Sequence, residues 1–367
     1  MSDSIIEDSI VRFFSKALDI ADCVNAEKTG RLPEQWNLAV ESGFANLLSP
    51  ESQGGVGVSW TDALPLFRGL GYYRVPLPLA ETVIANYLIN AGGHEVETSL
   101  PIALADEVTV AGLQLSGSGA DVVADGTLAR VPWARACDLI LVGLPDGRMG
   151  VWNLKAPGCE VAERVDVTKL PSDTVVLKAA RAEFVFDAPF PFVSQPARYL
   201  GALARSAMIV GAAEFALETS VQYALDRVQF GRPIGKNQAI QQQLAQMAGQ
   251  IAVARHASEL AFQNASSWTE PEQVGDSLSA GCAKVLAGEA ADIATSVAHQ
   301  VHGAIGFTYE HVLNFATRRM WVWREDHGTA SWWARRIGSQ VVKAGAQSFW
   351  PAMSRTSLYR NMEESAA

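Results

Sequence analysis

The sequence predicts a mostly α-helical protein with a small β domain, and three observations along the chain lead to this fold class. Residues 1–100 carry apolar side chains three and four positions apart in short runs. Residues 101–194 change to short β-branched runs between Asp, Gly and Pro, and residues 195–367 return to helical spacing in much longer runs. We therefore expect an N-terminal helical domain, a middle β domain and a C-terminal helical bundle with these limits.

Composition and charge restrict the class of protein. Of the 367 residues, 49% are hydrophobic and 19% are charged, which is enough apolar material for a large core and too much for a disordered chain. The formal charge of −10 is opposite to that of a nucleic-acid-binding surface, so we expect no nucleic-acid partner. The apolar stretch at 79–92 is interrupted by Glu81, Asn86 and Asn90, and we expect no membrane span.

The N-terminus and the cysteines indicate a cytoplasmic protein. Residues 1–7 are acidic and polar, without the basic and apolar parts of a signal peptide. The four cysteines lack CxxC spacing, which is typical of reduced thiols rather than of a disulfide or zinc framework. His299 and His302 stand three apart at a predicted helix end, but no third ligand is close in sequence, and we predict no metal site.

In the N-terminal part, a Gly-rich loop at 50–59 precedes a predicted helix through Leu64 and Phe67. Ser59 and Asp62 both suit the N-cap of this helix. We prefer Asp62, because Pro65 would then lie in the first turn, where proline is tolerated.

The middle and C-terminal parts have contrasting patterns. In the middle part we expect strands at 107–113, 139–144, 149–154 and 174–177, with a hairpin turn at 145–148, sequence PDGR. In the C-terminal part, apolar stripes run over 210–228, 240–254 and 282–301. Helices of this length with one apolar face predict an antiparallel bundle.

Two segments of the predicted bundle carry residues suited to a ligand. The first, residues 226–240, reads DRVQFGRPIGKNQAI. We expect its helix to run to about Phe230, to break over a Gly/Pro turn and to restart near Asn237. Arg227 and Phe230 would then be neighbours on one helix face. A guanidinium beside an aromatic ring suits a pyrophosphate next to a flat ring system.

The second segment, residues 299–310, reads HQVHGAIGFTYE. We expect it to end one helix, to bring backbone N–H groups close to a ligand at a Gly-containing turn, and to begin the next helix at Thr308. For each segment, the alternative interpretation is a helix–turn–helix corner with no ligand.

Together, in this order and spacing, the loop at 50–62 and these two segments resemble the acyl-CoA dehydrogenase family over nearly the whole chain. The resemblance implies a helical domain, a barrel-like β domain and a four-helix bundle, assembled as a tetramer with FAD between subunits. It implies α,β-dehydrogenation of an acyl-CoA thioester, with FAD as hydride acceptor, a carboxylate as base and a separate electron-transfer acceptor. The residues implied to contact the adenosine-pyrophosphate part of a neighbour's FAD are Arg227, Phe230, Gln238, Gln300 and Gly303.

The sequence departs from the family pattern at the base and in the middle domain. His327 takes the position of the usual Glu, with Asp326 beside it, and the alternative base position falls at Gly201. Asp326 and His327 are therefore the candidate catalytic residues, although a helix-end histidine exposed to solvent is the simpler interpretation of His327. No Trp-Ile-Thr-like segment is present; residues 131–136 are the nearest material and read as a strand edge.

These departures fall on one half of the implied flavin site. The sequence contains the residues of the half-site that is donated to a neighbour, whereas it lacks the motifs of the half-site that would bind the chain's own flavin. The pattern resembles the paired acyl-CoA dehydrogenase subunits of bacterial degradation of steroid side chains and other bulky CoA thioesters. We therefore expect a homologous partner in a heterotetramer. The alternatives are a non-catalytic assembly subunit that completes the partner's FAD site, and a self-sufficient homotetramer with an atypical base.

Overall fold

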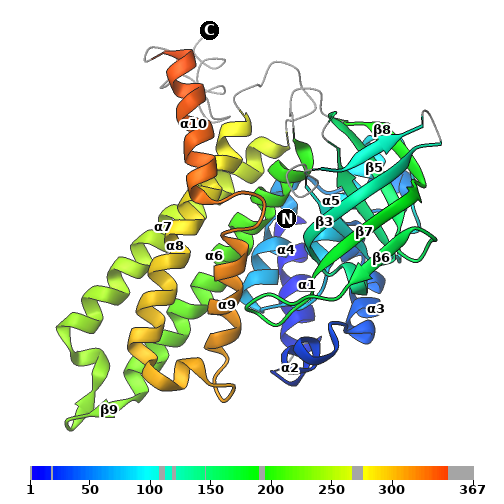
Figure 1. Cartoon of the computed structure of the whole chain (residues 1–367). Helices are drawn as coiled ribbons and strands as arrows, with labels where there is room; N and C mark the ends of the chain where they lie inside the picture. Colours follow the sequence, from blue (N-terminus) through cyan, green and yellow to red (C-terminus); the bar gives the residue numbers. More distant parts are fainter. Residues whose placement is uncertain are drawn as a thin grey trace.

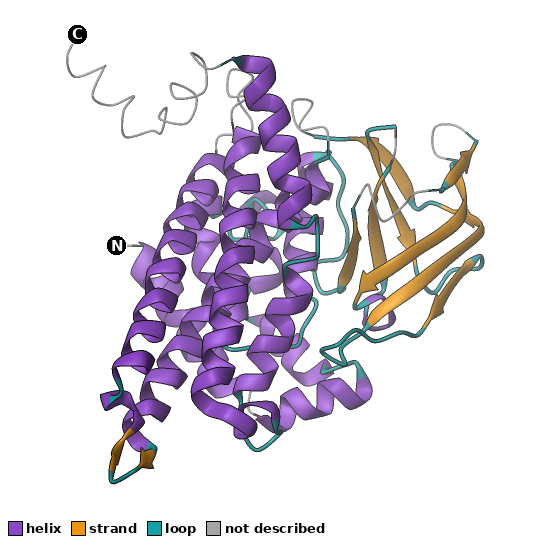
Figure 2. Ribbon diagram, turned by 60° about the vertical axis from the view of Figure 1, so that its left-hand side comes forward, coloured by secondary structure: helices purple, strands orange, loops and turns teal. Residues whose placement is uncertain are grey.

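The structure, a computed structural model, describes residues 2–17, 20–106, 112–117, 121–144, 146–189, 195–266 and 276–345. Helices form one side of the molecule and the two β-sheets form the other (Figures 1 and 2). This arrangement confirms the predicted fold class, mostly α with a small β domain.

Short helices form the N-terminal part of the described chain. Their bounds are α1 (Ser2–Ala17), α2 (Ile20–Thr29), α3 (Pro33–Glu41), η1 (Phe44–Asn46), η2 (Glu51–Gln53), α4 (Trp60–Tyr72) and α5 (Leu79–Ala91).

The N-cap of α4 is Ser59, so the prediction of Asp62 was wrong. The Ser59 side chain accepts a hydrogen bond from the backbone N–H of Asp62 at 3.1 Å. The Ser59 hydroxyl also donates to the Asp62 carboxylate at 2.7 Å, so the two candidate residues share one cap. Pro65 lies inside α4 as a consequence.

Two four-stranded sheets form the middle part. The strand orders are β1-β4-β5-β8 and β2-β3-β7-β6. The bounds are β1 (Ile102–Ala105), β2 (Gln114–Ser116), β3 (Val123–Pro132), β4 (Leu139–Gly143), β5 (Arg148–Asn153), β6 (Cys159–Ala162), β7 (Ser172–Arg181) and β8 (Phe184–Asp187), with the short helix η3 (Ala134–Ala136) after β3.

The predicted strands of the middle part are largely present. β4 pairs antiparallel with β5, which confirms the hairpin around residues 145–148, and 174–177 lies within β7. The predicted strand at 107–113 falls mostly outside the described residues.

The C-terminal part is a helical bundle, as predicted. It consists of α6 (Pro196–Asp226), α7 (Gln238–Ala265), α8 (Asp276–His302), α9 (Leu313–Trp323) and α10 (Ala330–Ala344), with short elements β9 (Val228–Gln229), β10 (Arg232–Pro233), η4 (Ile234–Lys236) and η5 (Gly303–Phe307). The proposed domains remain residues 1–100 for the N-terminal helices, 101–194 for the β domain and 195–367 for the bundle.

Helix α6 is the central element of the fold. It is long and apolar enough to cross a membrane by length and composition, a feature that the sequence analysis did not single out. However, 83% of its most apolar window is buried within the protein, as expected of a core helix. It lies between the N-terminal helices and the other bundle helices (Figure 1).

Helices α4 and α6 approach closely at two glycines. A Cβ added at Gly71 would lie 1.8 Å from the carbonyl oxygen of Met208, and one added at Gly211 would lie 2.0 Å from that of Arg68. Both obstacles are backbone atoms, so they could be relieved only by moving one helix away from the other.

We expect Gly71→Ala to lower the free energy of unfolding by about 1–3 kcal/mol, the usual cost of overpacking. Gly249→Ala is the matched control, because Gly249 lies in α7 with no atom within 4 Å of an added Cβ. The control should raise stability by roughly 0.5–1 kcal/mol through helix propensity. Urea unfolding of both variants tests this, and a neutral Gly71 variant would contradict the close approach.

Candidate functional site

The first predicted ligand segment forms a hairpin rather than the end of a helix. Helix α6 ends at Asp226, and Arg232–Pro233 pairs antiparallel with Val228–Gln229. Phe230 has φ 51° and Gly231 has φ 77°, a left-handed pair that turns the chain back. The prediction that the helix reaches Phe230 was therefore wrong, and Arg227 and Phe230 do not share a helix face.

The hairpin projects from the end of the bundle remote from the β-sheets (Figure 1). Phe230 is fully exposed, at 101%, and Arg227 and Gln238 are exposed as well. Asn237 caps α7, as its Oδ1 accepts a hydrogen bond from the Ala239 N–H at 3.1 Å. The aromatic ring and the guanidinium are thus held out into solvent on a short, closed turn.

The second predicted segment lies at the same end of the bundle. Helix α8 ends at His302, and the short helix η5 follows directly. Gly303 has φ 63°, and Gln300 and Gly303 are exposed. The next long helix begins at Leu313 rather than at Thr308, because Thr308 closes η5: its N–H and its hydroxyl both donate to the carbonyl of Ile305.

Stacked rings join the two segments. The ring of Tyr223, in the last turn of α6, stacks on that of His302 at 4.5 Å between centroids and 27° between planes. The Arg227 N–H donates to the Tyr223 carbonyl at 2.9 Å. The structure therefore brings Arg227 near the Gln300–Gly303 turn, although the two lie about 75 residues apart in sequence.

A second cluster surrounds the turn between α9 and α10, where the candidate base positions lie. Lys284 of α8 is fully buried, and its Nζ donates to the carbonyls of Arg324 at 2.7 Å and Gly328 at 3.0 Å. Burial lowers the pKa of Lys284 to about 7. The amine fixes both ends of the turn that carries Asp326 and His327.

His327 is buried, so the interpretation of an exposed helix-end histidine was wrong. Its side chain is 8% exposed, and its Nδ1 lies 3.1 Å from a carboxylate oxygen of Asp106. Asp106 also pairs with Arg198 of α6 at 3.3 Å. The imidazole covers Gly201, where an added Cβ would meet the ring at 2.4 Å. The two alternative base positions, 201 and 327, thus face each other, and neither carries a carboxylate.

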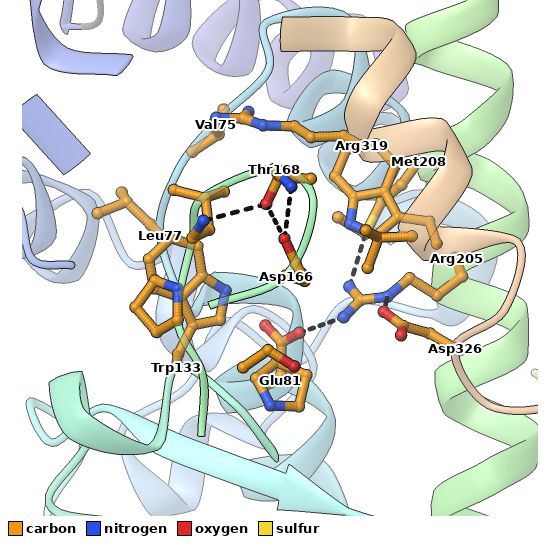
Figure 3. Close-up of a pocket in the computed structure, with 16 residues that line it drawn as sticks. Val75, Leu77, Glu81, Trp133, Asp166, Thr168, Arg205, Met208, Arg319 and Asp326 are labelled. Atoms are coloured by element: carbon orange, nitrogen blue, oxygen red, sulfur yellow. Dashed lines mark hydrogen bonds and ion pairs between the residues drawn. The ribbon is translucent and has the colours of Figure 1, made fainter. Parts of the chain in front are cut away.

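Asp326 is part of a separate buried ion-pair network. Arg205 of α6 donates to Glu81 of α5 at 2.5 Å and to Asp326 at 3.0 Å (Figure 3). The side chains of Arg205 and Glu81 are 4% and 3% exposed. Both carboxylates therefore pair with one guanidinium, and the Asp326 side chain keeps 23% of its surface exposed.

The cavity beside this network is small and charged (Figure 3). Its volume is about 40 Å³, which holds about three or four water molecules on the scale of about 10–15 Å³ each. Ligand pockets for ring systems typically need about 300 Å³ or more. The lining includes Arg205, Asp326, Glu81, Asp166 and Arg319. As described, these residues do not fit an isoalloxazine ring and a thioester.

Two residues that line the cavity, Trp133 and Arg319, were not predicted as site residues from the sequence. Trp133, in the stretch interpreted as a strand edge, has φ 60° and lines the cavity. Arg319 is 2% exposed, and neither of its terminal nitrogens has a partner among the described residues. Trp133 has a left-handed backbone conformation and lies between a strand and a short helix, so the spacing of apolar residues could not predict its position. Only the folded structure shows that it lines the cavity. No group of three metal-ligating side chains occurs among the described residues.

Comparison with known proteins extends these observations. Residues 198–341 match the family described as "Acyl-CoA dehydrogenase, C-terminal domain". The chain is 29% identical to the acyl-CoA dehydrogenase IpdE2 of Mycolicibacterium smegmatis over 301 residues, covering 81% of this chain and 83% of that protein.

Solved structures share the fold. The Tcur3481-Tcur3483 steroid ACAD has a TM-score of 0.82 at 22% identity, with 93% of this chain and 98% of that chain covered. The ChsE4-ChsE5 complex from Mycobacterium tuberculosis also has a TM-score of 0.82, at 21% identity, with 94% and 98% covered. At these identities the likeness concerns the fold.

Proposed function

We propose that this chain is a member of the acyl-CoA dehydrogenase family, whose cofactor is FAD, and that it is one subunit of an enzyme that oxidises an acyl-CoA at Cα–Cβ together with a homologous partner chain. In this proposal the chain completes the FAD site of its partner, and the partner supplies the base.

The contrast between the buried cluster around Asp326 and His327 and the exposed hairpin that carries Phe230 is the main support for this proposal. The cluster around Asp326 and His327 is closed by buried ion pairs, with space for only a few waters. The hairpin at the other end of the bundle instead presents an exposed arginine and a fully exposed phenylalanine. The left-handed backbone of Phe230 is a strained conformation, and such strain is typical of ligand-binding positions.

The donated half-site fits the outer part of an FAD. Arg227 would bind the pyrophosphate with its planar fork, and Phe230 would cover a flat ring. Gln238, Gln300 and Gly303 would supply amide and backbone polar groups on the same end of the bundle. The FAD itself supplies the hydride acceptor of the family reaction. This chain's own residues bind and orient it.

The substrate and the cellular context are further parts of the proposal. Similarity in fold to a steroid ACAD supports a bulky acyl-CoA thioester, of the steroid side-chain type, as substrate. We propose a heterotetramer, a separate electron-transfer acceptor and a cytoplasmic location, the last supported by four free cysteines.

A second candidate function is a self-sufficient homotetramer that uses His327 as base. The Asp106 carboxylate beside His327 Nδ1 favours it, because a carboxylate that orients an imidazole is typical of a histidine general base. Against it, the ring lies flat on Gly201, and Asp106 is shared with Arg198. The two candidates differ in flavin content and in the effect of His327 substitution.

The proposed function predicts the cofactor stoichiometry. We expect the isolated chain to retain little FAD, because its own cavity is filled with paired charges, and the assembly to contain one FAD per pair of unlike chains. Flavin absorbance per chain, measured on the chain alone and after co-purification with its partner, checks this. A tightly bound FAD in every chain of a homotetramer would overturn the proposal.

The second prediction concerns Arg227. Losing a charge-assisted bond to an anion costs roughly 1.5–3 kcal/mol, so Arg227→Ala should weaken FAD retention by the assembled complex about ten- to a hundred-fold. Arg227→Lys should rescue poorly, since it lacks the planar fork. Arg232→Ala is the matched control, an exposed arginine of the same hairpin. Unchanged flavin content after gel filtration of the Arg227 variant would make Arg227 a structural residue.

The third prediction concerns the base. We expect His327→Ala and Asp326→Asn to leave turnover of the assembled complex within about an order of magnitude, whereas losing a general base costs roughly 10²–10⁴-fold. Steady-state rates are compared at equal flavin content and equal assembly. If either variant collapses in rate with both intact, this chain carries its own base and the second candidate function holds.

A further inference from the structure

A compact group of rings lies beneath the donated half-site, and we name it the imidazole cluster: Tyr223, His302 and His311, with His299 one turn away. His302 stacks on Tyr223, and its centroid lies 4.7 Å from that of His311. His302 is 4% exposed. His299 stacks on Phe307 at 3.9 Å and bonds through Nε2 to the Thr317 hydroxyl at 3.0 Å.

Hydrogen bonds fix one tautomer of His302. Its Nδ1 lies 2.8 Å from the Ala298 carbonyl, which is only an acceptor, so Nδ1 carries the proton. Its Nε2 is buried without a hydrogen-bond partner among the described residues and is therefore the lone-pair nitrogen. In His311, Nδ1 accepts from the Leu313 N–H at 3.2 Å, so the proton of that neutral ring lies on Nε2.

The cluster connects the two segments that carry the half-site. Tyr223 lies four residues before Arg227 and accepts the Arg227 N–H through its carbonyl. His302 lies two residues after Gln300 and directly before Gly303. Among the ring contacts of the described chain, the Tyr223–His302 stack joins the end of α6 to the end of α8.

We infer that His302 is a positioning residue of the donated half-site: its neutral ring joins the Arg227 segment to the Gln300–Gly303 turn, and protonation of the ring separates them. This inference rests on the proposed function, because it assumes that the half-site holds a partner's FAD. His302 itself does not touch the ligand, since its Nε2 is buried.

The direction of the pH effect follows from the surroundings of the ring. A proton on Nε2 would place a charge with no acceptor inside the stack, facing Tyr223 of α6, His311 of the following loop and His299 of α8. Burial lowers the pKa of His302, and proximity to His311 and His299 lowers it further. Burial also lowers the pKa of His299 and His311.

The lowered pKa of His302 sets the direction of the pH dependence. When the two segments are separated, the His302 ring binds a proton more readily than when the segments are joined. The joined arrangement is therefore most stable above about pH 6.5, and its stability decreases as the pH falls below that value. Acid should therefore loosen FAD, and a single linked proton changes the dissociation constant by at most about tenfold per pH unit.

The test measures FAD retention by the complex of this chain with its partner between pH 5.5 and 7.5, by flavin fluorescence on dilution. In the wild type we expect the dissociation constant to rise as the pH falls through this range. His302→Asn keeps a donor for the Ala298 carbonyl but does not titrate. Its retention at pH 7.5 should stay within about threefold of wild type, and its pH dependence should be clearly flatter. His256→Asn is the control, since His256 is an exposed α7 histidine with an 84% exposed side chain.

A second readout does not depend on the flavin. NMR titration of the histidine ring protons in the complex should assign to His302 a pKa below the ordinary histidine value of about 6.5. A flat wild-type profile, or an Asn variant with the wild-type slope, overturns the inference. The failure of the proposed function gives a different result: Arg227→Ala would then leave flavin retention unchanged at every pH.

Discussion

The guanidinium of Arg205 links three parts of the chain that the sequence keeps far apart. It extends from the central helix α6, donates to Glu81 of the N-terminal helices, and donates to Asp326 of the turn between α9 and α10. Removing one member of such a buried set leaves an uncompensated charge, at a cost of about 3–5 kcal/mol. The Arg205 guanidinium therefore ties together the N-terminal helices, the bundle and the α9–α10 turn.

Stability alone does not account for this network. Buried ion pairs of this kind are often no better than well-packed apolar side chains of the same volume. Their specific effect here is geometric: Arg205 draws Asp326 inward, Lys284 holds both ends of the turn, and His327 is pressed onto Gly201. Together these contacts place paired charges around the small cavity beside α6. The same contacts that order the turn close the cavity.

Local sequence patterns predicted the elements but not the contacts between them. The bundle helices and the β4–β5 hairpin follow from the spacing of apolar residues and from turn chemistry, which act within a few positions. Arg205 and Glu81 are 124 residues apart, and Asp106 and His327 are 221 apart, so no periodicity connects them. The end of α6 was misplaced because the apolar stripe continues to Val228, whereas Arg227 is already extended and begins the hairpin that turns at Phe230 and Gly231. Gly201, a glycine within a buried helix, was the available signal for a close neighbour.

The position of the two clusters at different ends of the bundle bears on assembly. In the proposed assembly, a homotetramer would place each donated half-site against a copy of the cavity of about 40 Å³, which among the described residues is smaller than a flavin ring needs. The exposed Phe230 ring would then meet no aromatic partner, and Arg227 no anion, although both are held out on an ordered hairpin. A partner with an open cavity resolves both difficulties, because one chain contributes the outer half of each site and the other the reacting half. The proposed pairing with an unlike chain would therefore use the residues that this chain exposes on its hairpin, and it would not require a flavin pocket in this chain.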